Sequence, residues 1–444
     1  MLVYTMKRDF CVVGAGPVGL ATALLLAQQG YSVSVYESHA DIAVSNANSY
    51  PIGVNARGRR ALAAISEQLS TDLNHYGLTI DQWNIFAGTF RVASLSSGTV
   101  LSTTRADLSR LLLQQARATS AISIYAEHTL TDISLKSRTL TFTTESGDVT
   151  VDASSSRVIV ADGVRSVART RLAEQVPDFS PSVEDWGIQF RVLFSPPRTS
   201  VAGMNPQVHY IFTSTGVYAA SLKDGTWCVV LTATHNDPAT PLILSRIASP
   251  ANVEALKEHV ARVAPKASRV LPHHSYVDFF SRHSFSGAVV SCNRLAFDEW
   301  CVLIGDAAHS VIPPTGEGVN SGLEDAYVLT RHLDSETPFA DFETARLPDL
   351  QALNHYARGL RDNVKDPTWA RSVANTTVRI VDSVAQRLGL PHASVEDRLF
   401  GPNAQGEPYR DVLSPWIRQR QRIFSPLHRG LASLEGIGKG LRAK

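Results

Sequence analysis

The sequence has few of the features that would mark a metal-binding, membrane or nucleic-acid-binding protein. Its four cysteines (Cys11, Cys228, Cys292 and Cys301) have no CxxC or other metal-ligand spacing, so we expect reduced, mostly buried thiols and no metal site. Lysine and arginine total 42 against 41 aspartates and glutamates, and the formal charge of +1 carries no nucleic-acid signature. No window of about 18 continuous apolar residues occurs, and the N-terminus has no signal-peptide pattern. We therefore expect a cytoplasmic protein without a transmembrane helix.

What the chain does have is enough apolar sequence for a large folded core. Hydrophobic residues make up 44% and charged residues 19% of the 444 positions, which suits two or three subdomains. Residues 9–37 predict a strand, a helix and a second strand, with Pro17 in the first helical turn and Gly30 at its stop. Such a βαβ unit implies a parallel α/β sheet.

The rest of the chain divides by its hydrophobic periodicity. Residues 104–118 predict a second helix, and short strands follow up to about residue 160. From about residue 185 to residue 286, alternating β-branched and aromatic runs predict an antiparallel sheet that carries one helix. Residues 299–309 predict another strand of the first sheet, and helical patterns dominate after about residue 340.

The first motif is GAGPVG, a G-x-G-x-x-G between the first strand and its helix. It comprises Gly14, Gly16, Pro17, Val18 and Gly19. In this pattern one glycine permits the tight turn, one lets a pyrophosphate approach the backbone, and one lets helix and strand pack closely. Glu37 lies 18 residues further on, at the end of the second strand, where it favours an unphosphorylated adenosine ribose, and so FAD or NAD over NADP. The alternative is a glycine-rich turn without a ligand, which this context disfavours.

The second motif is VIVADGVRSVAR, residues 158–169. Asp162 and Gly163 end a buried strand, and such a pair taken alone is often only a turn. Arg165, Ser166 and Arg169 behind it offer hydrogen-bond donors to phosphates.

The third motif is GDAAHSVIPPTGEGVN, residues 305–320, in which a strand runs into glycine and proline turns. Asp306 is free to accept hydrogen bonds from a sugar or ribityl hydroxyl, and Gly316, Gly318 and Asn320 bring bare backbone to a surface. An amphipathic helix follows, and its N-terminal amides suit an anion or an electron-poor ring.

Two side chains of this motif have competing interpretations. His309 either packs and hydrogen-bonds locally, which we favour, or transfers a proton. Glu317, if ionised and close to such an anion or ring, would oppose the helix amides, so we expect its side chain to point away. Pro313 and Pro314 are expected to stiffen the loop.

Together the three motifs resemble the class A FAD-dependent aromatic monooxygenases, which have the p-hydroxybenzoate-hydroxylase fold. All fixed positions of G-D-A-A-H-x-x-x-P-x-x-G-x-G-x-N are present. Within that class the sequence is most similar to the kynurenine 3-monooxygenase family, through its opening and the segments ARGRRAL, TTRADLSRLLL and ARLPDLQAL. The resemblance covers roughly residues 8 to 360.

The resemblance implies a role for several residues. The implied cofactor-binding set is Gly14, Gly16, Pro17, Val18, Gly19, Glu37, Arg105, Leu130, Asp162, Gly163, Asp306, Pro313, Gly316, Gly318, Val319 and Asn320. In it Arg105 contacts the flavin, Leu130 flanks the adenine, and the amides of Val319 and Asn320 face the pyrimidine side of the ring. The Asp162–Gly163 turn lies where FAD and the nicotinamide meet.

The implied architecture is α/β, or α+β overall, with a Rossmann-like FAD-binding domain, an inserted antiparallel-sheet substrate domain and C-terminal helices. Its expected parts are residues 1–180 (FAD-binding, first part), 181–286 (β-rich substrate domain), 287–345 (FAD-binding, second part) and 346–444 (helical).

The substrate pocket matches the resembled family less well than the flavin motifs do. Arg91, in GTFRVAS, fits the arginine that would anchor a substrate carboxylate, but no tyrosine follows at the spacing expected of that family. An Asn-Tyr-like pair expected after PDLQAL is here Leu360-Arg361. The sequence therefore predicts a related hydroxylase whose substrate can differ from kynurenine.

In the resembled class NADPH or NADH reduces FAD, and a C4a-hydroperoxyflavin formed with O2 hydroxylates a small aromatic substrate. No catalytic acid or base is assigned. A flavin-dependent halogenase is disfavoured because none of the six tryptophans forms a W-x-W pair. A flavin dehydrogenase or reductase of the same fold and a non-catalytic FAD-binding regulator stay open.

The C-terminus, residues 416–444, is basic, with seven Lys or Arg against one acid. It suits either weak membrane-surface contact or a solvated helix with a frayed tail, which we favour because no apolar anchor is present. We expect a monomer or a homodimer.

Overall fold

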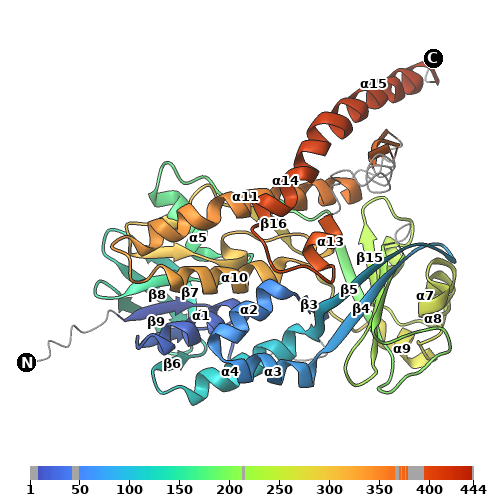
Figure 1. Ribbon diagram of the computed structural model, residues 1–444. Helices are drawn as coiled ribbons and strands as arrows, with labels where there is room; N and C mark the ends of the chain where they lie inside the picture. Colours follow the sequence, from blue (N-terminus) through green and yellow to red (C-terminus); the bar gives the residue numbers. More distant parts are fainter. Residues whose placement is uncertain are drawn as a thin grey trace, which may run out of the picture.

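The computed structural model describes residues 9–42, 50–212, 216–365, 370–371, 373–375, 377–378 and 395–442. It shows a mixed α and β chain built around two large sheets, which lie side by side (Figure 1).

The first sheet has six strands in the order β17-β18-β10-β1-β2-β6. The strands are β1 (Phe10–Val13), β2 (Val33–Tyr36), β6 (Ile122–Tyr125), β10 (Arg157–Val160), β17 (Ala296–Phe297) and β18 (Cys301–Leu303). All neighbours pair in parallel except β17 with β18. Because parallel sheets bury both faces, their strands are expected to be continuously apolar, and β1 and β18 are buried at every position.

Helices cover this sheet and pack on one another. They are α1 (Pro17–Gln28), α2 (Ala56–Ile65), α3 (Glu67–Tyr76), α4 (Arg105–Ala118), α5 (Val167–Gln175) and α10 (Gly318–Arg331). A three-stranded sheet of β7 (Thr129–Ser134), β8 (Thr139–Thr144) and β9 (Gly147–Asp152) joins the same core. In it Phe142 stacks on Tyr36 of β2, with ring centroids 4.5 Å apart.

The second sheet has seven strands in the order β12-β15-β14-β13-β4-β5-β3. Four come from the segment expected to form a sheet: β12 (Ile188–Phe194), β13 (Val208–Phe212), β14 (Val217–Ser221) and β15 (Trp227–Thr234). The other three are β3 (Pro51–Val54), β4 (Leu78–Ala87) and β5 (Phe90–Thr104), which the sequence analysis did not identify. Hydrogen bonds therefore join residues 51–104 to residues 181–286, and the four-part division of the chain stays a proposal.

The strands of residues 185–286 pair antiparallel with one another, as expected. The complete sheet is mixed, because β13 also pairs in parallel with β4 from a distant part of the chain, where no hairpin dictates direction. One expectation for this segment was wrong, because it carries four helices rather than one: α6 (Thr240–Leu244), α7 (Pro250–Val263), α8 (Pro265–Ser268) and α9 (His273–Phe279). The three missed helices have 5, 4 and 7 residues, too few to show a helical period.

The two faces of the seven-stranded sheet pack against different parts of the chain. Side chains alternate along each strand, and one set packs with α7, α8 and α9. The other set, which we call the inner face, packs towards the loop before α10 and the C-terminal helices. Those helices are α11 (Pro338–Lys365), α13 (Val395–Phe400) and α14 (Tyr409–Gln419). The third motif therefore lies between the two sheets.

The remaining elements connect and extend these layers. Strands β11 (Ser182–Asp185) and β16 (Ala288–Ser291) pair with each other. After α14, a π-helical turn (Arg420–Phe424) leads into α15 (Ser425–Arg442), which extends away from the body of the molecule (Figure 1). Within the described residues, no helix combines the length and apolar character needed to cross a membrane.

Candidate flavin-nucleotide site

The three motifs meet at the carboxyl ends of adjacent parallel strands. Gly14 follows β1, Asp162 follows β10, and Gly305 follows β18, and these strands are neighbours in the sheet. A Cβ added at Gly14, whose φ is +100°, would lie 2.4 Å from the carbonyl oxygen of Ala161. A Cβ at Gly305 would lie 3.2 Å from Val18 in the first turn of α1. In open α/β sheets, ligands bind outside these strand ends.

The glycines of the first motif have different surroundings. A Cβ at Gly19 would lie 2.0 Å from the carbonyl oxygen of Gly14, so Gly19 serves the close packing of helix on turn. Gly16 caps α1 with φ −69° and ψ 176°, and a Cβ there would meet nothing within 4 Å. The free amides that begin α1 therefore face open space, and such amides with the helix dipole favour a phosphate.

Glu37 ends β2 and lies beside this turn. One carboxylate oxygen accepts from the backbone N–H of Ala15 at 2.8 Å, and the other from that of His39 at 3.0 Å. Burial raises the pKa of Glu37, but these hydrogen bonds outweigh it and hold the pKa below the usual range. The backbone of His128 bonds Glu37, and Leu130, two residues further on, is buried in the core. The acid is therefore ionised, with Leu130 in its neighbourhood.

Asp162 caps the start of α5. Its Oδ2 accepts from the N–H of Val167 at 3.0 Å, while its buried Oδ1 has no hydrogen-bond partner among the described residues. Burial raises the pKa of Asp162. Next to it, Gly163 has φ +82°, and a Cβ there would meet nothing within 4 Å. An orphaned carboxylate oxygen beside open space suits a ligand donor group.

The expected phosphate donors behind this turn have other partners. Arg169 is buried, and its guanidinium donates to the carbonyl oxygens of Ala307 and Val164, both at 2.8 Å. Ser166 accepts from the backbone of Arg169. Arg169 therefore joins the second motif to the third, whereas Ser166 caps α5 within the second motif. Arg165 is exposed.

Asp306 has the surroundings expected of a ligand-binding carboxylate. Asp306 is exposed to solvent in the structure. The surrounding protein nevertheless raises its pKa by limiting its solvation, and the charges of Arg105 and His309 act in the opposite direction. Arg105 is the exposed first residue of α4. Charge effects of Arg105 and Asp306 also reach Tyr50, whose pKa is raised mainly by burial. The structure thus brings together two of the predicted cofactor residues with an aromatic side chain that the sequence did not single out.

The loop before α10 has a regular inner structure. Residues Pro313–Thr315 form a short 3₁₀ helix, and Gly316 follows with φ +67°. Helix α10 begins at Gly318, so Gly318 and the half-buried Val319 supply its first amides. The buried side chain of Asn320 donates to the carbonyl oxygens of Gly53 and Gly316, both at 2.9 Å. Asn320 therefore fixes the loop to β3.

Glu317 is bound within the protein, as expected for a carboxylate that points away from a flavin. It is fully buried and accepts from Asn55 Nδ2 at 2.8 Å and from the Tyr409 hydroxyl at 2.5 Å. Burial raises the pKa of Glu317 to about 7, and the Arg57 guanidinium opposes the shift. Tyr409, from the C-terminal helices, was not found by sequence reasoning, because nothing local marks a pairing across 92 residues.

A buried ionic cluster of Arg346, Asp325 and Glu324 packs beneath the third motif and bonds to its backbone at Gly305. Arg346 donates to Asp325 and Glu324, both at 2.9 Å. Asp325 also accepts from the N–H of Gly305 at 2.8 Å and bonds His309 through a short contact. His309 therefore has the local, structural role that was favoured. Arg346 lies in the ARLPDLQAL segment, which was noted for its resemblance but given no role.

The residues considered for substrate binding are not gathered at this site. Arg91 is exposed near the start of β5, and Arg105 follows the end of that strand. Arg91 pairs with Phe86 and Ser102 pairs with Leu78, so eight steps along β4 at about 3.3 Å each place Arg91 roughly 26 Å from Ser102, near the Arg105 end of β5. Arg361 forms an ion pair with Glu184 of β11. The structure thus leaves Arg91 apart from the cofactor residues.

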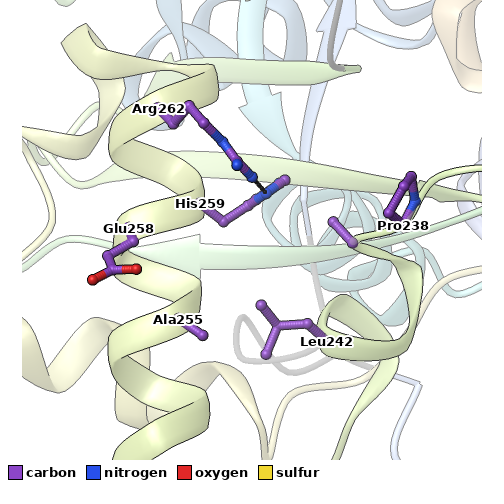
Figure 2. A pocket seen from close by; sticks show the side chains of 7 residues that line it. Pro238, Leu242, Ala255, Glu258, His259 and Arg262 are labelled. Carbon is purple, nitrogen blue, oxygen red and sulfur yellow. Dashed lines mark hydrogen bonds between the residues drawn. The ribbon is translucent and has the colours of Figure 1, made fainter.

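A cavity of about 410 Å³ lies elsewhere, between α6 and α7 (Figure 2). Figure 2 shows Leu242 and Ala255 lining it, with Arg262 Nη2 bonded to His259 Nδ1 at 3.2 Å. These helices cover the face of the sheet opposite the inner face, and the cavity contains none of the predicted cofactor residues. Among the residues the structure describes, no group of three or more His, Cys, Asp or Glu side chains could hold a metal ion.

The fold and the turns at the ends of β1, β10 and β18 define a dinucleotide-binding α/β protein. The chain belongs to the FAD binding domain family, which matches residues 7–337. It is 27% identical to kynurenine 3-monooxygenase of Salinispora arenicola, across 97% of this chain and 95% of that protein. Kynurenine 3-monooxygenase of Yarrowia lipolytica is likewise 27% identical, across 97% and 96%. The chain is therefore an FAD-dependent monooxygenase with FAD as its cofactor, as the resemblance predicted.

Solved structures share the fold. 2-Methyl-3-hydroxypyridine-5-carboxylic acid oxygenase matches with a TM-score of 0.66 at 18% identity, covering 81% of this chain and 93% of that one. PqsL of Pseudomonas aeruginosa, in complex with 2-aminobenzoylacetate, matches with a TM-score of 0.62 at 19% identity, covering 81% and 97%. The α/β fold with a second β-rich part, expected from the sequence, is thereby confirmed.

Proposed function

We propose that this protein uses NADPH or NADH and O2 to hydroxylate a small aromatic compound, in the manner of a kynurenine 3-monooxygenase. The observation that carries the proposal is the meeting of three turns at neighbouring strand ends, next to the largely apolar inner face of the second sheet. FAD, when bound, supplies the electron transfer and oxygen activation. The protein must bind FAD, orient the substrate and exclude water.

The residues present fit the dinucleotide end of FAD. Open space borders Gly16 at the start of α1, where amides and the helix dipole suit a pyrophosphate. Glu37 is ionised and near that turn, as a ribose ligand must be. Asp306 presents an exposed carboxylate to hydroxyl donors. These three features follow one another along the strand ends, so an elongated cofactor suits them.

The flavin end fits the amides that open α10. Gly318 and Val319 have N–H groups free of intrahelical partners, and the helix N-terminus favours negative charge on a reduced ring. The Glu317 carboxylate next to them is held by Asn55 and Tyr409 instead. Arg105 adds a positive charge close enough to Asp306 to lower the pKa of that carboxyl group. We propose that the nicotinamide meets FAD beside Asp162 and Gly163, where Asp162 Oδ1 has no hydrogen-bond partner among the described residues and open space borders Gly163.

Aromatic side chains connect this region to the second sheet. Tyr50 meets Phe190 of β12 edge-on at 5.2 Å and Phe285 at 5.0 Å, and the latter two rings stack at 5.0 Å. Such a wall excludes water and accepts an aromatic ring through stacking or edge contacts. We infer that the substrate lies between the inner face and the loop that contains Pro313.

The test is a reaction of purified protein supplied with FAD. NADPH and NADH oxidation should accelerate with kynurenine or another aromatic acid, and the product should be one oxygen atom heavier, in step with O2 consumed. Glu37→Leu should remove both flavin and activity. Protein that cannot take up FAD would contradict the proposal. So would a flavoprotein whose NADPH or NADH oxidation no aromatic compound accelerates. Failure with kynurenine alone, beside success with another aromatic, would change only the substrate.

A further inference from the structure

A histidine on the inner face of the second sheet has an unusual hydrogen-bonding arrangement. His209 of β13 is 3% exposed. Trp83 of β4 donates its indole N–H to His209 Nδ1 at 3.0 Å, and the Tyr218 hydroxyl of β14 lies 2.7 Å from the same nitrogen. Three strands thus fix the orientation of one imidazole ring.

These contacts determine the tautomer. An indole N–H can only donate, so Nδ1 must act as an acceptor and carries no proton. Burial lowers the pKa of His209 to about 3, so the ring is neutral. The single proton of a neutral imidazole is then on Nε2. His209 consequently presents an N–H donor on the side away from Trp83.

That donor has no partner in the part of the chain that the structure describes. Nε2 is buried and makes no hydrogen bond. Buried polar groups almost always have partners, because leaving one unsatisfied costs about 1–3 kcal/mol. The arrangement therefore points to an acceptor outside the described part of the chain.

The surroundings of His209 border accessible space. Its inner-face neighbours Tyr218, Ile211 and Val230 are only half-buried, whereas the residues that alternate with them on β13, β14 and β15 are buried. On the adjacent strand β4, Trp83 lies opposite His209 and is likewise half-buried. The inner face is thus partly accessible to solvent around His209.

The histidine is also close to the third motif. Trp83 meets Phe400 of α13 edge-on, with centroids 5.2 Å apart. Phe400 in turn reaches Gly316, where an added Cβ would lie 3.1 Å from its Cζ atom. A short series of ring contacts therefore leads from His209 to the loop that contains Pro313 and Gly316.

We propose that His209 is a specificity-determining residue whose Nε2–H donates a hydrogen bond to an oxygen of the aromatic substrate. This inference rests on the proposed hydroxylase function and narrows its substrate class to aromatic compounds that carry an acceptor oxygen, such as an aryl ketone or a carboxylate. A hydrogen-bonding site rejects analogues that lack the matching group, because its buried donor is then left unpaired. His209 orients the substrate and takes no part in proton transfer.

The test compares two probes that differ only at the oxygen, 2-aminoacetophenone and 2-ethylaniline. Holoprotein is titrated with each, and binding is followed by the change in flavin absorption. The wild type should bind the ketone about tenfold or more tighter than the ethyl compound. His209→Leu should abolish that preference. His209→Gln, which keeps a donor near the Nε2 position, should recover part of it, and Tyr218→Phe, which leaves Nε2–H intact, should retain it.

The ratio of the two affinities is measured within each protein, so a general loss of stability does not imitate the effect. Flavin content and thermal midpoint are recorded for every variant. If His209→Leu does not fold, the wild-type ratio and the His209→Gln ratio still decide. Equal affinity of the wild type for both probes, or an unchanged preference in His209→Leu, would overturn the inference while leaving hydroxylase activity intact. Holoprotein that binds neither probe and hydroxylates no aromatic compound would overturn the function and the inference together.

Discussion

Replacing Arg346 with methionine should destabilise the FAD-binding part of the protein by about 3–5 kcal/mol. Arg346 is 2% exposed and bonds Asp325 and Glu324, which are 0% and 5% exposed. Methionine fills similar space but leaves two buried carboxylates without this guanidinium. Removing one partner of a buried ion pair incurs that penalty because the remaining charge is neither solvated nor compensated.

The measurement is urea unfolding of the holoprotein, followed by flavin fluorescence so that the FAD-binding part is monitored. Arg358→Met is the matched control, because Arg358 lies on the same helix α11 but is 37% exposed and pairs with Glu184 at 2.9 Å. An exposed pair contributes about 0–1 kcal/mol. If Arg346→Met loses no more free energy of unfolding than Arg358→Met, the buried cluster does not support the loop as argued.

Loss of Arg346 should also weaken FAD binding, because the cluster holds the turn that carries Asp306. Asp325 holds the N–H of Gly305 at 2.8 Å, directly before Asp306. Burial raises the pKa of Asp325, but His309 and Arg346 outweigh it and hold the pKa below its usual range. Without Arg346 the carboxylate protonates more readily and the turn loosens. Arg346→Met should therefore bind FAD less tightly, whereas Arg358→Met should not.

Three further outcomes are expected. Gly16→Val should fold with an unchanged thermal midpoint in the absence of flavin, because a Cβ at Gly16 meets nothing within 4 Å. The variant should nevertheless purify with little FAD. Full flavin content would show that the open space beside Gly16 is not the pyrophosphate site. Glu37→Gln keeps the side-chain length but loses the charge, so FAD affinity should fall by about tenfold, as read from flavin release on dilution; unchanged affinity would remove Glu37 from the ribose site. Glu317 has its pKa raised from 4.5 to about 7, so its proton-linked stability is complete below pH 4.5 and is lost as the pH rises to about 7. The thermal midpoint of Glu317→Gln should therefore gain on that of the wild type between about pH 5 and about pH 7.5, and a constant difference would contradict the raised pKa.

Elements with a strong local pattern could be predicted from the sequence. The βαβ unit, α4, β10, β18 and α10 were all located, because apolar periodicity and flanking glycines are properties of neighbouring residues. The three strands β3, β4 and β5 were missed, because much of β5 is a serine- and threonine-rich run with exposed residues and shows no alternation. The pairing of β4 with β13 depends on a contact between distant segments, which no local pattern records.

In the candidate site, too, residues marked by local turns were predicted, whereas contacts with distant residues were not. Gly14, Asp162 and Asp306 were predicted one by one from turns after buried strands, and parallel pairing then brings those turns to one edge. The contacts of Arg169 with the carbonyl oxygens of Ala307 and Val164 could not be predicted, since a donor in a sequence does not reveal the acceptors it will meet.

The sequence by itself determined the cofactor. A phosphate site forms from a strand, a glycine turn and a helix N-terminus that lie within a few residues of one another. The local sequence is therefore enough to predict the site and the kind of ligand it binds. Only the tertiary structure decided what surrounds that cofactor: the partners of Glu317, the cluster around Arg346, and the tautomer and unpaired donor of His209. Each of these depends on burial and on residues brought from distant strands and helices. Burial and long-range pairing alone set the charge state and hydrogen-bonding capacity of such groups.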